Sequence, residues 1–145
     1  MTNEEKMLIA IHEALVAFNE GEVPVGAALI KDDIVIASAH NQCIKMRDPT
    51  AHAELLVIQK AIKLIDSFKN CSLYVTLEPC AMCAGAIVNS QIENLYFGAF
   101  DKAEGCCGSL IDLTDHWLSH SCKTVGGILE EDCASLLTSF FKNKH

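Results

Sequence analysis

The chain has 145 residues, half of them apolar, and a formal net charge of −8 at pH 7 with Arg47 as its one arginine. This length predicts a single domain over residues 1–145 with a sizeable core. No apolar run approaches the roughly 20 residues of a membrane span, and the acidic start lacks the basic region of a signal peptide, so we expect a cytoplasmic protein with no membrane partner. A mean hydropathy of +0.24 is high for a small monomer and favours a homo-oligomer.

The first half of the chain predicts a helix, a hairpin and a second helix. Thr2 followed by Glu5 resembles a capping box, and a helical apolar period then continues to about residue 20. Residues 24–31 and 34–39 are short β-branched and apolar runs, which is typical of a hairpin. Residues 50–67 form the next expected helix. Its expected buried stripe is Leu55, Ile58, Ile62 and Ile65.

The second half alternates strands with helices. The expected elements are a strand over 72–77, a helix over 80–90, a strand over about 93–98, a short helix near 111–118, a weak strand near 122–126 and a final helix over about 129–142. A helix between the last two strands lets them run parallel. A hairpin followed by this alternation predicts an α/β fold in three layers, with a mixed five-stranded sheet between helices.

Two short runs carry the chemistry, His52-Ala53-Glu54 and Pro79-Cys80-Ala81-Met82-Cys83. Together they offer one imidazole and two thiols, and a catalytic zinc keeps three protein ligands and leaves one position for water. Cys80 and Cys83 are three residues apart and share a face of a helix. Glu54 diverges from His52, which suits a proton carrier better than a fourth ligand.

Both runs are expected at helix starts. Asp48 is a plausible N-cap with Pro49 in the first turn, and Glu78-Pro79 repeats that pattern before Cys80. We therefore interpret Glu78 as a helix-start residue. Free N–H groups and the helix dipole favour negative charge there, which lowers thiol pKa and helps to keep both cysteines as thiolates. Most other cysteines are expected to be small buried side chains.

The order H-x-E followed by P-C-x-x-C is the signature of zinc-dependent nucleobase deaminases. The chain resembles the cytidine-deaminase-like fold, and within it the bacterial tRNA-specific adenosine deaminases. The resemblance spans almost the whole sequence. It is carried by Val23–Ala27, Asp48–Glu54, Thr76–Ala86, Phe97–Ala99 and Gly108–Leu110.

The resemblance implies a role for each matching residue. His52, Cys80 and Cys83 would bind one Zn²⁺ per chain, and Glu54 would shuttle protons. Asn41 would hydrogen-bond the flipped nucleoside and Val25 would wall the base pocket. The implied partners are a second copy of the chain, as a homodimer, and a tRNA anticodon stem-loop, whose wobble adenosine becomes inosine. The expected RNA contacts are Arg47, Lys102, Phe141, Lys142 and Lys144.

The chain departs from the family where RNA contacts are expected. Phe100 stands where arginine or another polar residue is common, Cys106-Cys107 replace small residues, and the basic tail shrinks to Lys142, Lys144 and His145. Two alternatives therefore remain open. One is a free-base or nucleoside deaminase that acts on guanine or cytosine. The other is a catalytically silent, zinc-stabilised subunit, although a structural site has no use for the acid of Glu54.

Overall fold

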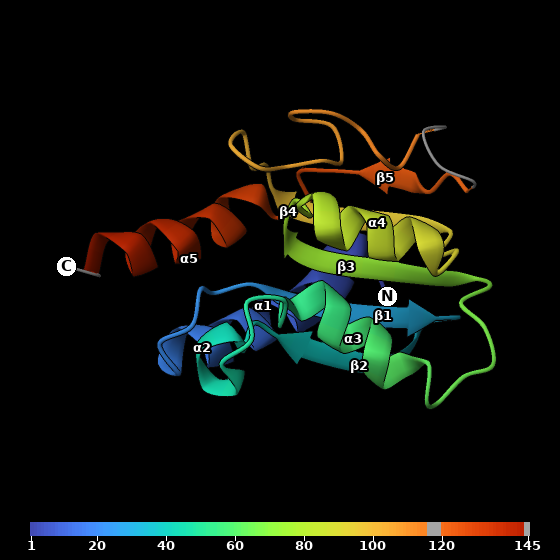
Figure 1. Cartoon of the computed structure of the whole chain (residues 1–145), viewed down its shortest axis with the longest axis horizontal. Coiled ribbons are helices and arrows are strands. Elements are labelled where there is room, and N and C mark those ends of the chain that lie inside the picture. The colour runs from blue at the N-terminus through green and yellow to red at the C-terminus, as the bar shows by residue number, and fades with distance from the viewer. Residues whose placement is uncertain (116–119, 144–145) are drawn as a thin grey trace.

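The computed structural model describes residues 1–115 and 120–143 and centres on a five-stranded sheet in the order β2-β1-β3-β4-β5 (Figure 1). β1 pairs antiparallel with β2 and with β3, whereas β3, β4 and β5 run parallel. This is the predicted mixed sheet with its last two strands parallel. The strands are β1 (Gly26–Lys31), β2 (Ile34–His40), β3 (Cys71–Leu77), β4 (Asn94–Ala99) and β5 (Lys123–Val125).

Helices cover both faces of the sheet, which confirms the three-layer prediction. Figure 1 shows α3 and α4 in front of the sheet, and α1 behind it. Each face has its own apolar core, one with Val57 and Ile87 and the other with Met7 and Cys133. The helices are α1 (Asn3–Asn19), the short α2 (Cys43–Met46), α3 (Ala53–Ala61), α4 (Ala81–Asn89) and α5 (Glu130–Asn143).

The predicted helix over 50–67 is shorter than expected. It begins at Ala53 and ends at Ala61, and its fully buried side chains include Val57 rather than the predicted Ile58. The buried face of α3 is therefore rotated away from the predicted stripe and consists of Ala53, Glu54, Val57 and Ala61. Ile62, beyond the last turn, is 49% exposed.

The short helix predicted near 111–118 is wrong for residues 111–115, and residues 116–119 lie outside the described part of the chain. Asp112 pairs as an isolated bridge with Cys107, and its carboxylate accepts hydrogen bonds from the backbone N–H and hydroxyl of Thr114. Such side-chain bonds give the backbone an alternative to the helix.

A glycine permits α1 to lie against β1. A side chain at Gly26 would overlap the backbone of Ala10 and Ala14 in α1. The Gly26 N–H also donates to the Thr76 hydroxyl of β3 at 3.1 Å. These contacts fix the start of β1. In the described residues, no helix has both the length and the apolar character needed to cross a membrane.

We expect Gly26→Ala to lower the free energy of unfolding by about 1–3 kcal/mol, as overpacking does, because backbone cannot move aside as a flexible side chain can. Gly85→Ala is the matched control, since an added Cβ in the middle of α4 meets nothing within 4 Å. The control should gain up to about 1 kcal/mol from helix propensity. Equal denaturant midpoints for the two variants would contradict the close packing of α1 on β1.

Candidate metal centre and substrate cleft

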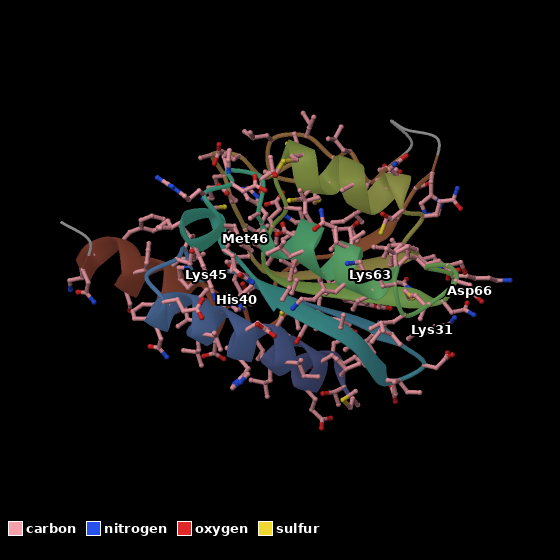
Figure 2. The ribbon with its side chains drawn as sticks, turned by 60° about the horizontal axis from the view of Figure 1, so that its bottom comes forward. Lys31, His40, Lys45, Met46, Lys63 and Asp66 are labelled. Atoms are coloured by element: carbon pink, nitrogen blue, oxygen red, sulfur yellow. The ribbon has the colours of Figure 1, made fainter. Side chains whose placement is uncertain are left out.

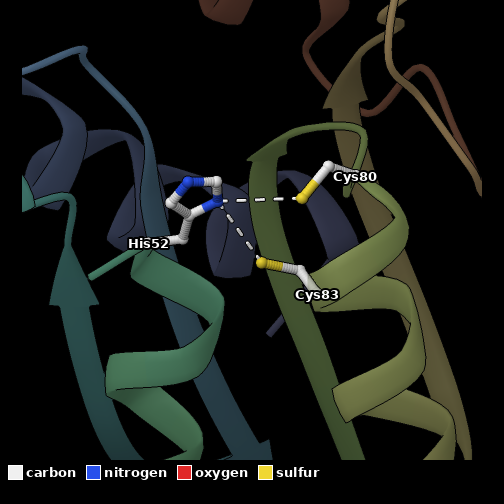
Figure 3. A group of neighbouring side chains, drawn as sticks. All are labelled: His52, Cys80 and Cys83. Carbon is white, nitrogen blue, oxygen red and sulfur yellow. Dashed lines mark hydrogen bonds between the residues drawn. The ribbon is translucent and has the colours of Figure 1, made fainter. Parts of the chain in front are cut away.

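The two sequence motifs meet because α3 and α4 begin side by side. His52 is the N-cap of α3 and Cys80 the N-cap of α4, both with extended backbone, while Cys83 lies in the first turn of α4. Figure 3 shows the imidazole facing both thiols. The His52 Nδ1 atom lies 3.8 Å from Cys80 Sγ and 3.5 Å from Cys83 Sγ.

The predicted helix entries are displaced from the observed helix starts, because α3 begins at Ala53 rather than at Pro49 and α4 begins at Ala81 after the N-cap Cys80. Asp48 is not the cap of α3, because its carboxylate instead accepts from the backbone and hydroxyl of Thr50 in the preceding turn. Neither cap position offers a side-chain hydrogen bond to its own helix. The imidazole and the Cys80 thiol are therefore free to face each other.

The cluster is electrostatically prepared for a cation. A hydrogen bond from Cys83, and then one from His52, lowers the pKa of Cys80 to about 3. The same contact raises the pKa of Cys83. The bond to Cys80 also raises the pKa of His52. A thiolate beside an imidazole is the donor chemistry of a transition-metal site.

The donor set fits one metal ion. One ligand atom each from His52, Cys80 and Cys83 lies within 4.8 Å of the others, and Glu54 is not in this group. One nitrogen and two sulfurs match zinc, and three protein donors leave a position open. The cluster could therefore hold a metal in the manner of a catalytic site.

Glu54 is buried beside the cluster. Its side chain is 4% exposed and lines the same cavity as His52 and Cys80. Burial raises the pKa of Glu54 to about 7. A carboxyl that titrates near neutral pH can both accept and release a proton, as general acid–base chemistry requires.

A cavity of about 760 Å³ opens above the cluster. It lies between the residues around β1 and α2, the loop after β4, and α5. Among the residues predicted to touch substrate, Val25, Asn41, Lys102 and Phe141 all line it. Five carboxylates line it as well. These are Glu54, Glu78, Asp101, Glu104 and Glu130.

Asn41 connects the cavity to the start of α3. Its side-chain oxygen accepts from the Ala53 N–H at 2.8 Å, and its backbone N–H donates to the Val25 carbonyl at 3.1 Å. The oxygen is therefore engaged. Within the described residues no protein acceptor is recorded for the side-chain NH₂ group, which is left to donate into the cavity.

The other predicted cationic residues are not brought together with the cluster. Arg47 and Lys142 are exposed and do not line the cavity, and Lys144 lies outside the described residues. Arg47 ends α2 with a positive φ of 51°. Of the expected cationic RNA contacts that the structure describes, only Lys102 lines the cavity.

Glu78 has a role that the sequence did not reveal. It is 1% exposed, and its carboxylate accepts backbone N–H bonds from Asp101 at 3.0 Å, Cys107 at 3.1 Å and Ser109 at 2.9 Å, together with the Ser109 hydroxyl. A side chain at Gly105 would overlap this carboxylate. Glu78 thus ties the loop after β4 to the start of α4, and the interpretation as a helix-start residue is wrong. The polar, glycine-rich stretch over 101–109 was the available signal.

Comparison with known proteins identifies the family of this chain. The family of MafB19-like deaminases matches residues 1–143. A tRNA-specific adenosine deaminase of Bacillus subtilis is 45% identical, with 98% of this chain and 91% of that protein covered. The chain belongs to the tRNA adenosine deaminase family.

Solved structures agree in fold. A structure from a study of A-to-I editing by tRNA:A34 deaminases at the wobble position of transfer RNA has a TM-score of 0.86 and 38% identity, and covers 92% of this chain and 99% of that one. A guanine deaminase from Nitrosomonas europaea has a TM-score of 0.83 at 21% identity, with 96% of this chain and 84% of that one covered. At that identity the second match shows only a shared fold.

The Glu78 contacts predict acid sensitivity of this deaminase. Burial alone would raise the pKa of Glu78, but the hydrogen bonds from Ser109, Asp101 and Cys107 outweigh it and hold the pKa below its usual value. The ionised Glu78 carboxylate therefore stabilises the folded protein above its unfolded pKa of about 4.5. This stabilisation is lost as the pH falls through the lower pKa of the folded state.

We expect Glu78→Gln to lower thermal stability at pH 7, because the amide carries no charge and its NH₂ group faces donors. Its deficit relative to the wild type should shrink as the pH falls below about 4.5, where the wild-type carboxyl itself becomes protonated. Hydrogen exchange at the Asp101, Cys107 and Ser109 amides should accelerate in the variant. Unchanged protection of these amides would contradict the anchoring role.

Proposed function

We propose that this deaminase converts the wobble adenosine of a tRNA anticodon loop to inosine by hydrolysis. The observation that carries the proposal is the placement of buried Glu54 beside a His-Cys-Cys donor set at one cavity, in a chain that belongs to the tRNA adenosine deaminase family. A free-base deaminase is the alternative that the experiments below exclude or favour.

His52, Cys80 and Cys83 would hold one zinc ion per chain. Nitrogen and sulfur donors that converge on one point, two of them at helix N-termini, fit this ion. When bound, zinc lowers the pKa of a coordinated water toward neutrality and so supplies a nucleophile at cellular pH.

Glu54 moves the protons. Its carboxylate accepts the proton of the attacking water and delivers it to N1 of the purine, which makes C6 electrophilic. The water oxygen bonds to C6, and Glu54 then takes the remaining proton from that oxygen and passes it to the 6-amino nitrogen. The C6–N bond breaks, ammonia leaves, and the oxygen remains as the C6 carbonyl of inosine. Burial suits this work, because it raises the pKa of Glu54 to about 7 and the cost of losing and regaining a proton near neutral pH is small.

Asn41 and Val25 hold the base. The side-chain NH₂ group of Asn41 donates to the nucleoside, since its oxygen is already engaged by Ala53. Val25 is 5% exposed and offers an apolar wall. The target base must leave its stack to enter, and an anticodon loop, already partly single-stranded, makes that step inexpensive.

The anticodon stem-loop would lie over the mouth of the cavity. Lys102 contacts a phosphate and Phe141 stacks on a base at this mouth, where both side chains line the cavity. Arg47, Lys142 and Lys144 serve as outer contacts. α2, which Arg47 ends, carries Lys45, and Figure 2 shows Lys45 on the side of the molecule where α5 ends and away from Lys31.

The active form is proposed to be a homodimer in the cytoplasm, where tRNA is available. Exposed apolar side chains such as Leu64 (67%) and Ile62 (49%) support a covered face. Light scattering after size exclusion measures the assembly directly. A monomer at micromolar concentration would contradict the proposed dimer but would not contradict the proposed deamination mechanism.

The roles of Glu54 and Cys80 are separable. Glu54→Gln should keep its zinc and its melting temperature but lose about 10²–10⁴-fold in kcat, the usual contribution of a positioned acid–base group. Cys80→Ala should lose zinc as well as activity. Metal content by atomic absorption and inosine formation in a hairpin measure the two effects. Turnover near the wild-type rate in Glu54→Gln would contradict the proton-transfer role.

The substrate class is tested by ammonia release from an adenosine-containing anticodon hairpin, adenosine, guanine and cytosine. We expect turnover of the hairpin only. Lys102→Ala should reduce the log–log salt slope of hairpin binding by about 0.7, the value for one phosphate contact on a single strand.

Lys31→Ala is the matched control for this measurement. Lys31 is the last residue of β1, whereas the cavity-lining Val25 directly precedes the first residue of that strand. Figure 2 shows Lys31 far from α2. The control should leave the slope unchanged. Guanine or cytosine turnover without hairpin turnover would move the assignment to a small-molecule deaminase.

A further inference from the structure

The mouth of the cavity carries an aromatic ring that the proposed chemistry does not use. Phe100 follows the last residue of β4, lines the cavity and is 47% exposed. Single exposed apolar side chains are common on protein surfaces, so exposure alone assigns no role. A role is indicated by three further features, which are the contacts that hold the ring, its depth in the cavity and the charge around it.

The Phe100 ring is braced from behind. The buried ring of Phe97 meets it edge to face, with ring centres 5.0 Å apart and planes at 85°. A side chain at Gly126 would come within 2.8 Å of the Phe100 ring. The ring therefore occupies space that the glycine leaves free. Its orientation is set before any ligand arrives, so little side-chain freedom is lost on binding.

The ring lies at the rim of the cavity rather than at its floor. Glu54, beside the metal donors, is 4% exposed, whereas Phe100 is 47% exposed. The next residue, Asp101, donates its N–H to the buried carboxylate of Glu78 at 3.0 Å, which ties the backbone at this point. A base that reaches Glu54 is deeper than Phe100, and the neighbouring nucleotide of the same strand remains at the rim.

The charge at this rim favours an uncharged partner. Asp101, Glu104 and Glu130 line the cavity, against the one cation Lys102 among the described lining residues. Carboxylates repel phosphate groups, so the part of an RNA strand that suits this wall, away from Lys102, is the face of a base. Unstacked bases in loops bind aromatic side chains through face contact.

We propose that Phe100 is a stacking platform for the base next to the target adenosine, a role that rests on the proposed function. The target base enters the cavity, and the flanking base lies on the exposed face of the Phe100 ring. Stacking is tolerant of base identity, so Phe100 would hold the loop open for many sequences rather than read one.

The test combines protein variants with modified hairpins. Phe100→Leu keeps apolar volume and removes the ring, and Phe100→Tyr keeps the ring. On an intact anticodon hairpin, Phe100→Leu should raise KM by at least about fivefold, the lower end of the loss of one base–aromatic stack. Because the ring does not contact the reacting atoms, kcat should change by less than about twofold. Phe100→Tyr should restore KM.

Hairpins with an abasic site on the 5′ or the 3′ side of the target complete a double-mutant cycle. If Phe100 stacks on a flanking base, Phe100→Leu should not raise KM further on the hairpin that lacks that base. The proposal would be overturned if the KM effects of Phe100→Leu and of the abasic site multiplied on both hairpins. It would also be overturned if Phe100→Tyr and Phe100→Leu raised KM equally. If the wild-type protein deaminates no hairpin, the proposed function fails and this inference fails with it. Hairpin turnover that is insensitive to Phe100→Leu overturns this inference alone.

Discussion

The site depends on one constraint, the parallel start of two helices on the same face of the sheet. α3 and α4 begin side by side, with His52 and Cys80 at their N-caps. The first backbone N–H groups of a helix have no partner within the helix, and the dipoles of both helices favour negative charge at this point. The Cys80 thiolate is stabilised here, Cys83 supplies the second sulfur, and the His52 imidazole at the start of α3 completes the donor set. A shift of either helix by one residue would separate these atoms.

Two buried glutamates of the site illustrate how environment assigns function. Glu78 accepts four hydrogen bonds from the loop over 101–109, which hold its pKa down and make it a fixed anion. Burial dominates for Glu54 and raises its pKa to about 7. The first carboxylate shapes the wall of the cavity, and the second is available to exchange protons within it. The same side chain is thus an anchor in one place and a proton carrier in the other.

Much of this arrangement could be predicted from the sequence because it depends on local signals. The period of apolar residues predicted the strands and long helices, and the spacing of His52, Cys80 and Cys83 predicted their convergence. The helix starts were misplaced because Asp48 is a cap residue type and both Asp48 and Glu78 stand directly before a proline, yet both carboxylates accept hydrogen bonds from other backbone groups. The role of Glu78 depends on donors 23 to 31 residues away, which no local pattern contains. The position of single lysines around the cavity is also a tertiary property, and among the lysines that the structure describes only Lys102 lines it.

We propose that His52, Cys80 and Cys83 hold a zinc ion with an open position beside Glu54. Zinc X-ray absorption on the purified protein measures this coordination. The account predicts one zinc per chain with two sulfurs at about 2.3 Å and two nitrogen or oxygen neighbours at about 2.0–2.1 Å, one of them exchangeable water. The same spectrum is expected for Glu54→Gln. A shell of four protein ligands, or one that changes when Glu54 is replaced, would contradict the account.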